Sequence, residues 1–214
     1  FHHHFRNGDH IINNVLDKLA EMGFKNLTLA ASSLSAVHAP LIEHIRSGLI
    51  THIETSGLRG ELAEQISRGL MDFPVVFRSH GGRASAIRSG ELHIDVAFLG
   101  APSCDPYGNA NGYSRDDDDG ISCGSLGYAR TDAEFADKVI IITNNIVSYP
   151  NAPWAIPEHD VDYVVRVDDI GDPKGIMSGA TRYTKDPKEL LIAKTAANVV
   201  EAAGYLYDGF SMQM

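Results

Sequence analysis

The sequence has few cysteines, no long apolar run and no excess of basic residues, and each absence excludes a class of protein. Two of its 214 residues are cysteines, Cys104 and Cys123. They could form a single disulfide bond, which is too few for a disulfide framework in a chain of this length. We therefore expect free thiols in a reducing compartment, the cytoplasm. No apolar run approaches the roughly 20 residues of a membrane-spanning helix, and the opening FHHHFRNGDH has no signal-peptide pattern. We therefore expect no membrane association.

The charge and the missing motifs narrow the function further. A net charge of -10 argues against nucleic-acid binding, which needs a basic face. No strand is followed by Gly-x-Gly-x-x-Gly and no Walker-type loop is present, so dinucleotide oxidoreductases and P-loop nucleotidases are weak candidates. What remains is an ordinary composition, 43% hydrophobic and 21% charged, that predicts one folded domain over residues 1–214.

Strand-like and helix-like patterns alternate along the first hundred residues. Such alternation predicts an α/β fold, with an open, mostly parallel sheet, helices on both faces, and ligands at the carboxyl ends of the strands. Residues 1–5 resemble the end of a strand. Further strands are predicted at 27–31, 50–55, 75–78, 93–99, 139–143 and 163–167, and helices at about 10–22, 40–47, 61–70, 83–88 and 187–203.

The stretch 101–127 interrupts this rhythm. It is rich in Gly, Asn, Ser and Asp and contains four consecutive aspartates, 116–119. A loop of this length within a compact domain is usually functional or disordered. The aspartate run lacks the alternating ligands and the glycine of a calcium loop, so we expect a solvated loop tip.

Four loops that follow predicted strands are candidates for ligand binding: residues 5–9, 55–60, 79–83 and the loop beginning at 100. Three of them carry an arginine, namely Arg6, Arg59 and Arg83, and guanidinium pairs with carboxylate and phosphate groups bidentately. Glycines such as Gly57, Gly81 and Gly82 let backbone amides approach an anion. Each loop alone could be an ordinary turn; together at one edge of a sheet they favour a binding site.

Two groups of histidine-containing residues could be either functional or structural. Ser79, His80, Gly81 and Gly82 fit either an oxyanion cradle or a glycine-rich turn with an exposed histidine. His2 and His4 lack companions at metal-site spacing, so we expect no metal.

The segment 89–112, SELHIDVAFLGAPSCDPYGNANG, resembles the coenzyme A transferase superfamily, in which a strand with Asp-Val precedes Asp-x-x-Gly-Asn. Here these are Asp95-Val96 and Asp105 to Asn109. More narrowly, the chain resembles the citrate lyase α-subunit family, through blocks in order along nearly its whole length. These are FHHHFRNGD, LAEMGFKNLTLAASSL, PLIEHIRSGLI, TSGLRGELAEQIS, SHGGRASAIRSGELHIDVAFLG, CGSLGYARTDAEFAD and KDPKELLIAKTAANVVEAAGY.

The resemblance implies a transferase that exchanges acetyl for citryl on a carrier thioester, without a covalent glutamyl intermediate. Glu54, Glu61 and Glu91 are therefore not expected to be nucleophiles. No covalently bound cofactor is implied; the carrier's prosthetic group, phosphoribosyl-dephospho-CoA, or CoA itself would be the co-substrate. The implied partners are the lyase β-subunit, the acyl carrier γ-subunit and a second half of the same subunit, in an oligomer.

The resemblance also sets the expected site. Arg6, Arg59 and Arg83 would hold carboxylate or phosphate groups, and amides at Gly57, Gly81 and Gly82 would face thioester oxygen, beside Ser79 and His80. Asn109 and Asn111 would shape the rim. The family protein is about twice as long, so we expect residues 1–214 alone to be inactive. The acidic loop 113–122 departs from the family pattern.

Two other functions stay open. One is a related acyl-CoA transferase or hydrolase that uses free CoA, and the other is a non-catalytic α/β binding module. The choice between citrate and citramalate as acceptor is also open.

Overall fold

The computed structural model describes residues 1–2, 5–113, 122–176 and 184–210. Contacts divide the chain into two units, Phe1–Ser178 and Gly179–Met214, and each is described by itself. The larger unit holds all the described strands and both hydrophobic cores.

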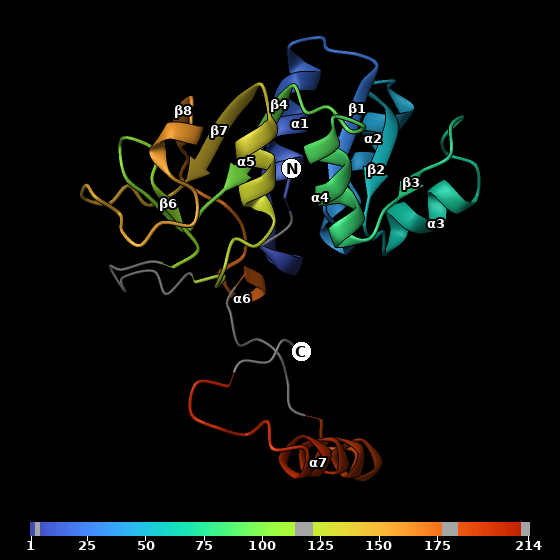
Figure 1. Ribbon diagram of the computed structural model, residues 1–214. Coiled ribbons are helices and arrows are strands. Elements are labelled where there is room, and N and C mark those ends of the chain that lie inside the picture. Colours follow the sequence, from blue (N-terminus) through green and yellow to red (C-terminus); the bar gives the residue numbers. More distant parts are fainter. Residues whose placement is uncertain (3–4, 114–121, 177–183, 211–214) are drawn as a thin grey trace. The chain divides into compact units, whose positions relative to one another are not determined.

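The strands of the larger unit form two parallel sheets of three strands each (Figure 1). The orders are β1-β2-β3 and β4-β7-β8, and every pairing within them is parallel. The predicted α/β class is confirmed. The strands are β1 Leu27–Ala31, β2 Ile50–Thr55, β3 Val76–Phe77, β4 Val96–Gly100, β7 Lys138–Thr143 and β8 Tyr163–Arg166.

Helices pack against these sheets and build two cores. Helix α1 bridges the cores: Ile12 and Leu16 pack with β1 and β2, whereas Ile11 packs with β4 and β7. The core around β1 and β2 also contains residues of α2 and α3. The core around β4 and β7 also contains residues of α4 and α5. The helices are α1 Ile11–Glu21, α2 Leu41–Arg46, α3 Glu61–Ser67, α4 His80–Ser89, α5 Ala129–Phe135 and the short η1 Arg6–Gly8, η2 Ala36–His38, η3 Glu158–Asp160 and α6 Pro173–Ile176.

Helix α4 begins three residues earlier than the sequence predicts. The side chain of Ser79 accepts a hydrogen bond from the backbone N–H of Gly82, at 3.0 Å, which caps the helix. His80, Gly81 and Gly82 are therefore the first helical turn, where two glycines had suggested a loop. The cap outweighs the low helix propensity of glycine.

The stretch predicted as one long loop contains a small antiparallel pair, β5 Ser103–Cys104 with β6 Ala110–Asn111. Both strands are buried, and both cysteines of the chain are free and buried. Hydrogen bonds between Asp105 and Asn109 order the backbone here, where the sequence predicted a long loop. The aspartates 116–119 lie outside the described residues.

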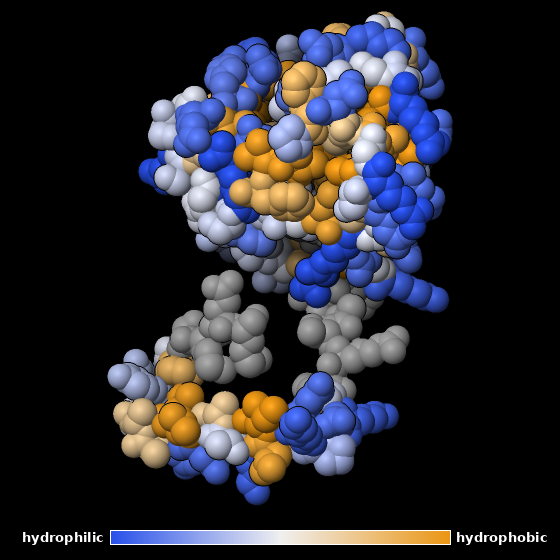
Figure 2. All heavy atoms as spheres, turned by 90° about the vertical axis from the view of Figure 1, so that its right-hand side faces the viewer, coloured by the Kyte–Doolittle hydropathy of each residue, from blue (hydrophilic) through white to orange (hydrophobic). Residues whose placement is uncertain are grey.

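The smaller unit is described from residue 184 to residue 210. Its helix α7, Pro187–Ala202, is capped by Asp186, whose carboxylate accepts from the N–H groups of Lys188 and Glu189. Leu190, Leu191 and Ile192 are exposed on it. Figure 2 shows hydrophobic side chains on the surfaces of both units. Within the described ranges, no helix is long and apolar enough to cross a bilayer.

Candidate functional site

The carboxyl ends of β1 and β4 meet the same segment at the start of the chain. The α-amino group of Phe1 donates to the carbonyl of Ala30 (2.9 Å), and the N–H of Ser32 donates to the carbonyl of Phe1 (3.2 Å). Gly100, the last residue of β4, packs closely on Phe5. A Cβ atom added to Gly100 would lie 2.8 Å from the Cζ atom of the Phe5 ring. The two sheets therefore share one edge, called here the carboxyl edge.

The loops after β1 and β2 run side by side at this edge. The N–H of Leu34 donates to the carbonyl of Gly57 (2.8 Å), and the N–H of Arg59 donates to the carbonyl of Leu34 (3.0 Å). The Gly57 N–H is engaged by Thr55 Oγ1 at 3.3 Å. The side chain of Arg59 is exposed, and among the described residues it has no ion pair. Of the two predicted groups, Arg59 is available to an anion and the Gly57 amide is engaged.

The start of α4 offers polar groups next to the start of α5. The N–H groups of His80 and Gly81 lie in the first helical turn, where a helix supplies no internal acceptor. The His80 ring lies 6.1 Å from the ring of Tyr128, the residue that precedes α5. Both side chains are exposed. An anion with an acyl oxygen would find amide donors and an imidazole here.

Arg83 faces inward rather than toward solvent. Its guanidinium binds the Asp132 carboxylate bidentately, at 2.8 and 2.5 Å, and both side chains are almost fully buried. The Nδ1 atom of His2 lies 3.8 Å from the same carboxylate. Arg83 therefore neutralises a buried acid between α4 and α5, and no sequence signal had singled out Asp132.

Asp105, the first residue of the Asp-x-x-Gly-Asn motif, organises the hairpin. Its carboxylate accepts the N–H groups of Tyr107 (2.9 Å), Gly108 (3.0 Å) and Asn109 (3.1 Å), and the N–H of Asn151 (2.9 Å). Burial alone would raise the pKa of Asp105, but these hydrogen bonds outweigh it and lower the pKa below its ordinary value. The motif thus folds the backbone around an ionised carboxylate.

The two asparagines of the predicted rim are also engaged internally. The amide nitrogen of Asn109 donates to Asp105 (2.8 Å) and to Glu158 (2.9 Å), and its oxygen accepts the N–H of Glu158 (3.0 Å). Asn111 donates to the carbonyl of Pro153 and accepts from Tyr113. Both are buried, so the structure shows them supporting the backbone of the edge.

Arg6 lies in a left-handed conformation, with φ of 53°, and its side chain is exposed. Burial raises the pKa of the Cys123 thiol to about 12, and the nearby charge of Arg6 works in the opposite direction. Two residues later, Gly8 packs so closely on α6 that an added Cβ would lie 2.8 Å from the N atom of Ile176. Arg6 is therefore presented beside the hairpin by a tightly held turn.

Two of the glutamates that were not expected to be nucleophiles share one arginine partner. Glu54 and Glu91 both bind Arg78, at 2.8 and 3.1 Å. His93, Asp95 and Asp137 lie close enough to share an ion, but all three are exposed, and such surface groups are common without one.

Along the chain, the predicted residues follow β2, β3, β4 and the segment 1–5. Hydrogen bonds join Ser79 to two of them: its side chain accepts from the N–H of Gly82, and its carbonyl accepts from the N–H of Arg83. Within the described ranges, no hydrogen bond or ion pair links Arg59 to Arg83 or to Asn109, whose partners are Asp132 and Asp105. Residues that the sequence reading missed are Asp132 and Asn151, which carry no motif of their own.

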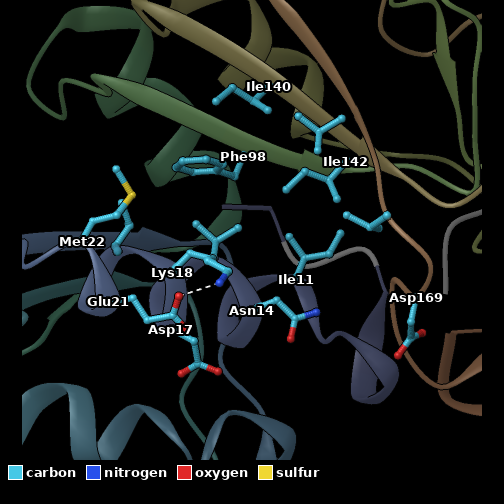
Figure 3. A pocket seen from close by; sticks show the side chains of 14 residues that line it. Ile11, Asn14, Asp17, Lys18, Glu21, Met22, Phe98, Ile140, Ile142 and Asp169 are labelled. Atoms are coloured by element: carbon cyan, nitrogen blue, oxygen red, sulfur yellow. Dashed lines mark hydrogen bonds and ion pairs between the residues drawn. The ribbon is translucent and has the colours of Figure 1, made fainter.

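A groove with a volume of about 680 Å³ lies elsewhere, between α1 and one face of the β4-β7-β8 sheet. Phe98, Ile140 and Ile142 line it from the strands (Figure 3). On the α1 side, Lys18 and Glu21 form an ion pair of 2.5 Å. None of the predicted site residues lines this groove.

Comparison with known proteins supplies the context of these loops. The family model described as "Citrate lyase, alpha subunit (CitF)" matches residues 1–214. The curated citrate lyase alpha chain of Haemophilus influenzae is 58% identical over 213 residues, which are 100% of this chain and 42% of that relative. The chain thus spans about two fifths of the relative's length.

Two solved structures extend the comparison. A putative citrate lyase alpha subunit from Streptococcus mutans, solved in complex with citrate, has a TM-score of 0.87 and 57% identity. The match covers 98% of this chain and 40% of that one. Glutaconate coenzyme A-transferase from Acidaminococcus fermentans has a TM-score of 0.52 at 12% identity, over 90% of this chain and 78% of that one. The second match shows a shared fold alone.

Proposed function

Because this chain belongs to the citrate lyase α-subunit family, we propose that its full-length protein is an acyl transferase that exchanges acetyl for citryl on a carrier thioester. In the net reaction, citrate and the acetyl thioester give the citryl thioester and acetate. The observation that carries the proposal is the 57% identity to a structure solved with citrate, over 98% of this chain. Citrate is therefore the proposed acceptor.

Arg6 and Arg59 are the proposed anion-binding groups. Both guanidinium groups are exposed at the carboxyl edge, and neither has an ion pair within the described part of the chain. A tricarboxylate and the phosphates of a CoA-like group both present oxygen pairs that match guanidinium geometry. Because α-subunit relatives are longer, we place the rest of the site on the remainder of the same subunit.

The start of α4 is the proposed contact for the thioester oxygen. The N–H groups of His80 and Gly81 have no acceptor within the helix, and Gly81 has open space where a Cβ would be. Charge that develops on a thioester oxygen during acyl transfer is stabilised by such donors. Ser79 and Gly82 hold this turn in place through their hydrogen bond.

Arg83, Asn109 and Asn111 are assigned a supporting role in this proposal, together with Gly57. Their polar groups are engaged within the protein: Arg83 holds α4, Gly57 holds the loop of Arg59, and the two asparagines hold the hairpin beside Arg6. Loss of one of them would move the edge rather than remove a ligand contact.

The proposed co-substrate is the acyl carrier's prosthetic group, phosphoribosyl-dephospho-CoA, as a thioester. The proposed partners are the lyase β-subunit and the carrier γ-subunit, in the cytoplasm. Two free, buried cysteines fit a reducing compartment.

The test is an exchange assay with the full-length subunit. Purified acetyl-carrier and ¹⁴C-citrate are incubated with it, and citryl-carrier is detected by mass spectrometry. We expect citrate-dependent formation of citryl-carrier, with acetyl-CoA a poorer donor, and none with residues 1–214 alone. A full-length subunit that forms no citryl thioester from either donor would refute the proposal. Turnover by residues 1–214 alone would refute the division of the site between the two halves.

A further inference from the structure

Three metal-ligating side chains lie together at the amino ends of β4 and β7, the end of the sheet opposite to the carboxyl edge. His93 and Asp95 belong to the chain that leads into β4, and Asp137 directly precedes β7. One ligand atom from each residue lies within 4.8 Å of the other two. None of the three belongs to the proposed acyl-transfer site, so the group is a separate feature of the molecule.

The pairing of the strands explains why these side chains meet. Alternate residues of an extended chain point to the same side, so His93 and Asp95 share one side. Strands β4 and β7 lie side by side in parallel, with Val96 beside Lys138, so the residues that precede them are also neighbours (Figure 1). His93 and Asp137 are 44 positions apart in the sequence. The sequence predicted no metal site because this pairing leaves no local pattern.

The backbone around the group is fixed by hydrogen bonds. The N–H of Asp137 donates to the carbonyl of Ile94 (3.0 Å), and the N–H of Lys138 donates to the carbonyl of Asp95 (3.0 Å). They continue directly into the pairing of β4 with β7. Side chains that a sheet holds in this way are positioned more precisely than side chains on a free loop. Only side-chain rotation is needed to close the group around an ion.

The distances within the group fit ligands of one metal ion. The Nε2 atom of His93 lies 3.0 Å from Oδ2 of Asp137 and 3.9 Å from Oδ1 of Asp95. Two ligand atoms bound tetrahedrally to Zn²⁺, at about 2.0–2.1 Å each, lie roughly 3.3 Å from one another. The two observed distances fall on either side of this value. A bound ion would replace the hydrogen bond between His93 and Asp137.

The charge of the group suits a divalent cation. An imidazole that binds a metal is neutral, so the group brings two negative charges, from Asp95 and Asp137. Within the described ranges, no lysine or arginine forms an ion pair with either carboxylate. The neighbouring cation, Lys138, is paired with Asp162 at 2.7 Å. A divalent cation would balance both carboxylates.

The ligand types select the class of metal. Exposed carboxylates are common without an ion, but the imidazole of His93 distinguishes this group from a cluster of acids. Imidazole nitrogen suits Zn, Cu, Fe and Ni, whereas Mg²⁺ and Ca²⁺ are bound through oxygen atoms. Three protein ligands leave one tetrahedral position of Zn²⁺ for water.

We propose that His93, Asp95 and Asp137 bind one Zn²⁺ ion, which joins the amino ends of β4 and β7. The unfolded chain has no such arrangement of ligands, so the ion stabilises the folded chain in proportion to its concentration. The site lies at the opposite end of the sheet from Arg6 and Arg59, and its role is to hold two strands together.

The test is zinc binding by the full-length subunit, which is freed of metal with a chelator and titrated with ZnCl₂ in a calorimeter. We expect one saturable site and a Tm that rises with the Zn²⁺ concentration. His93→Ala and Asp137→Asn should each weaken this binding by at least about tenfold and remove the rise in Tm. Both side chains are exposed, and far-UV circular dichroism checks that the variants are folded.

The matched control is His159→Ala, which should bind Zn²⁺ as the wild type does. His159 is also exposed and lies 3.5 Å from a carboxylate oxygen of Asp160. In the part of the chain that the structure describes, it belongs to no group of three metal-ligating side chains. An affinity for Zn²⁺ that is the same in His93→Ala as in the wild type would overturn the proposal, as would a wild type without saturable binding.

A second measurement identifies the ligand atoms. Co²⁺ replaces Zn²⁺, and its visible absorption bands report the coordination of the ion. We expect bands of a four-coordinate ion in the wild type, their loss in His93→Ala, and no displacement of Co²⁺ by an excess of Mg²⁺. If Mg²⁺ displaces Co²⁺, or if the bands persist in His93→Ala, the carboxylates attract cations without the imidazole and the zinc site is refuted.

Discussion

The guanidinium of Arg83 and the carboxylate of Asp132 form a buried bidentate pair that joins α4 to α5. The two residues are 49 positions apart in the sequence. A charge removed from water in this way is tolerated only with its partner, so each residue depends on the other. The pair fixes the two helices at whose amino ends the His80 and Tyr128 rings lie.

Breaking this pair should destabilise the larger unit strongly. We expect Arg83→Met to lower the free energy of unfolding by about 3–5 kcal/mol, because Asp132 would stay buried without a counter-charge. The double variant Arg83→Met/Asp132→Leu should lose less than the sum of the two single changes. Urea unfolding measures the free energies of the single and double variants.

The control is Arg68→Met, because Arg68 forms an exposed ion pair with Glu64. We expect this change to lower the free energy of unfolding by less than about 1 kcal/mol. Equal losses of stability in Arg83→Met and Arg68→Met would contradict this account.

Asp105→Asn should weaken the hairpin and change its response to acid. The pKa of Asp105 is lower in the folded chain than in the unfolded chain. Its contribution to stability is therefore present above the unfolded value of about 4 and is lost as the pH falls through the lower, folded value. We expect a loss of about 2–3 kcal/mol at pH 7 and a smaller loss near pH 3.

The measurement is unfolding by urea at several pH values, with Asp95→Asn as the control, since the Asp95 side chain is 90% exposed. A difference between wild type and Asp105→Asn that stays constant from pH 7 to pH 3 would mean that the carboxylate charge does not hold the hairpin.

Gly8→Ala and Gly81→Ala form a matched pair that separates crowding from helix propensity. An alanine at Gly8 would press on the backbone of Ile176, so we expect a loss of at least about 1–3 kcal/mol. Gly81 has open space around it and lies in α4, so alanine there should gain about 0.5–1 kcal/mol. Thermal unfolding compares the two; a stabilised Gly8→Ala would show that η1 and α6 do not pack as described.

Arg59→Ala in the full-length subunit should lower kcat/KM for citrate or carrier by about tenfold or more, which corresponds to about 1.4 kcal/mol or more of lost transition-state binding. Arg68→Ala is the control, because Arg68 is also exposed but lies at the end of α3 rather than in a loop of the carboxyl edge. The exchange assay with acetyl-carrier measures both. Transfer kinetics that are unchanged in Arg59→Ala would remove this residue from the site.

Much of the fold follows from local patterns. The apolar spacing of residues 11–22 gave α1 because Ile12 and Leu16 fall on one face, and the apolar runs of β1, β2 and β7 gave the parallel strands. The start of α4 was misjudged because a serine cap outweighed two glycines. The hairpin in 101–127 was missed because its polar residues are satisfied by one another, which a composition cannot show.

The sequence predicts the position of the candidate loops, but not the partners of their side chains. Glycine and arginine after strands located the loops at the carboxyl edge. Which arginine is free depends on tertiary partners: Arg83 and Arg59 look alike in sequence, but only Arg83 has a buried acid opposite it, from a helix far along the chain. The hydrogen bond between Asn109 and Glu158 likewise joins residues 49 positions apart, which no local pattern predicts.

The contact between Gly8 and the segment at Gly171 has a consequence for the order of assembly during synthesis. The N–H of Asp172 donates to the carbonyl of Gly8, across more than 160 residues of intervening chain. A growing chain emerges from the ribosome amino end first, so β1, β2 and their helices have their partners early. The turn that presents Arg6 therefore acquires this contact only after β8, the last strand of the two parallel sheets, has been made.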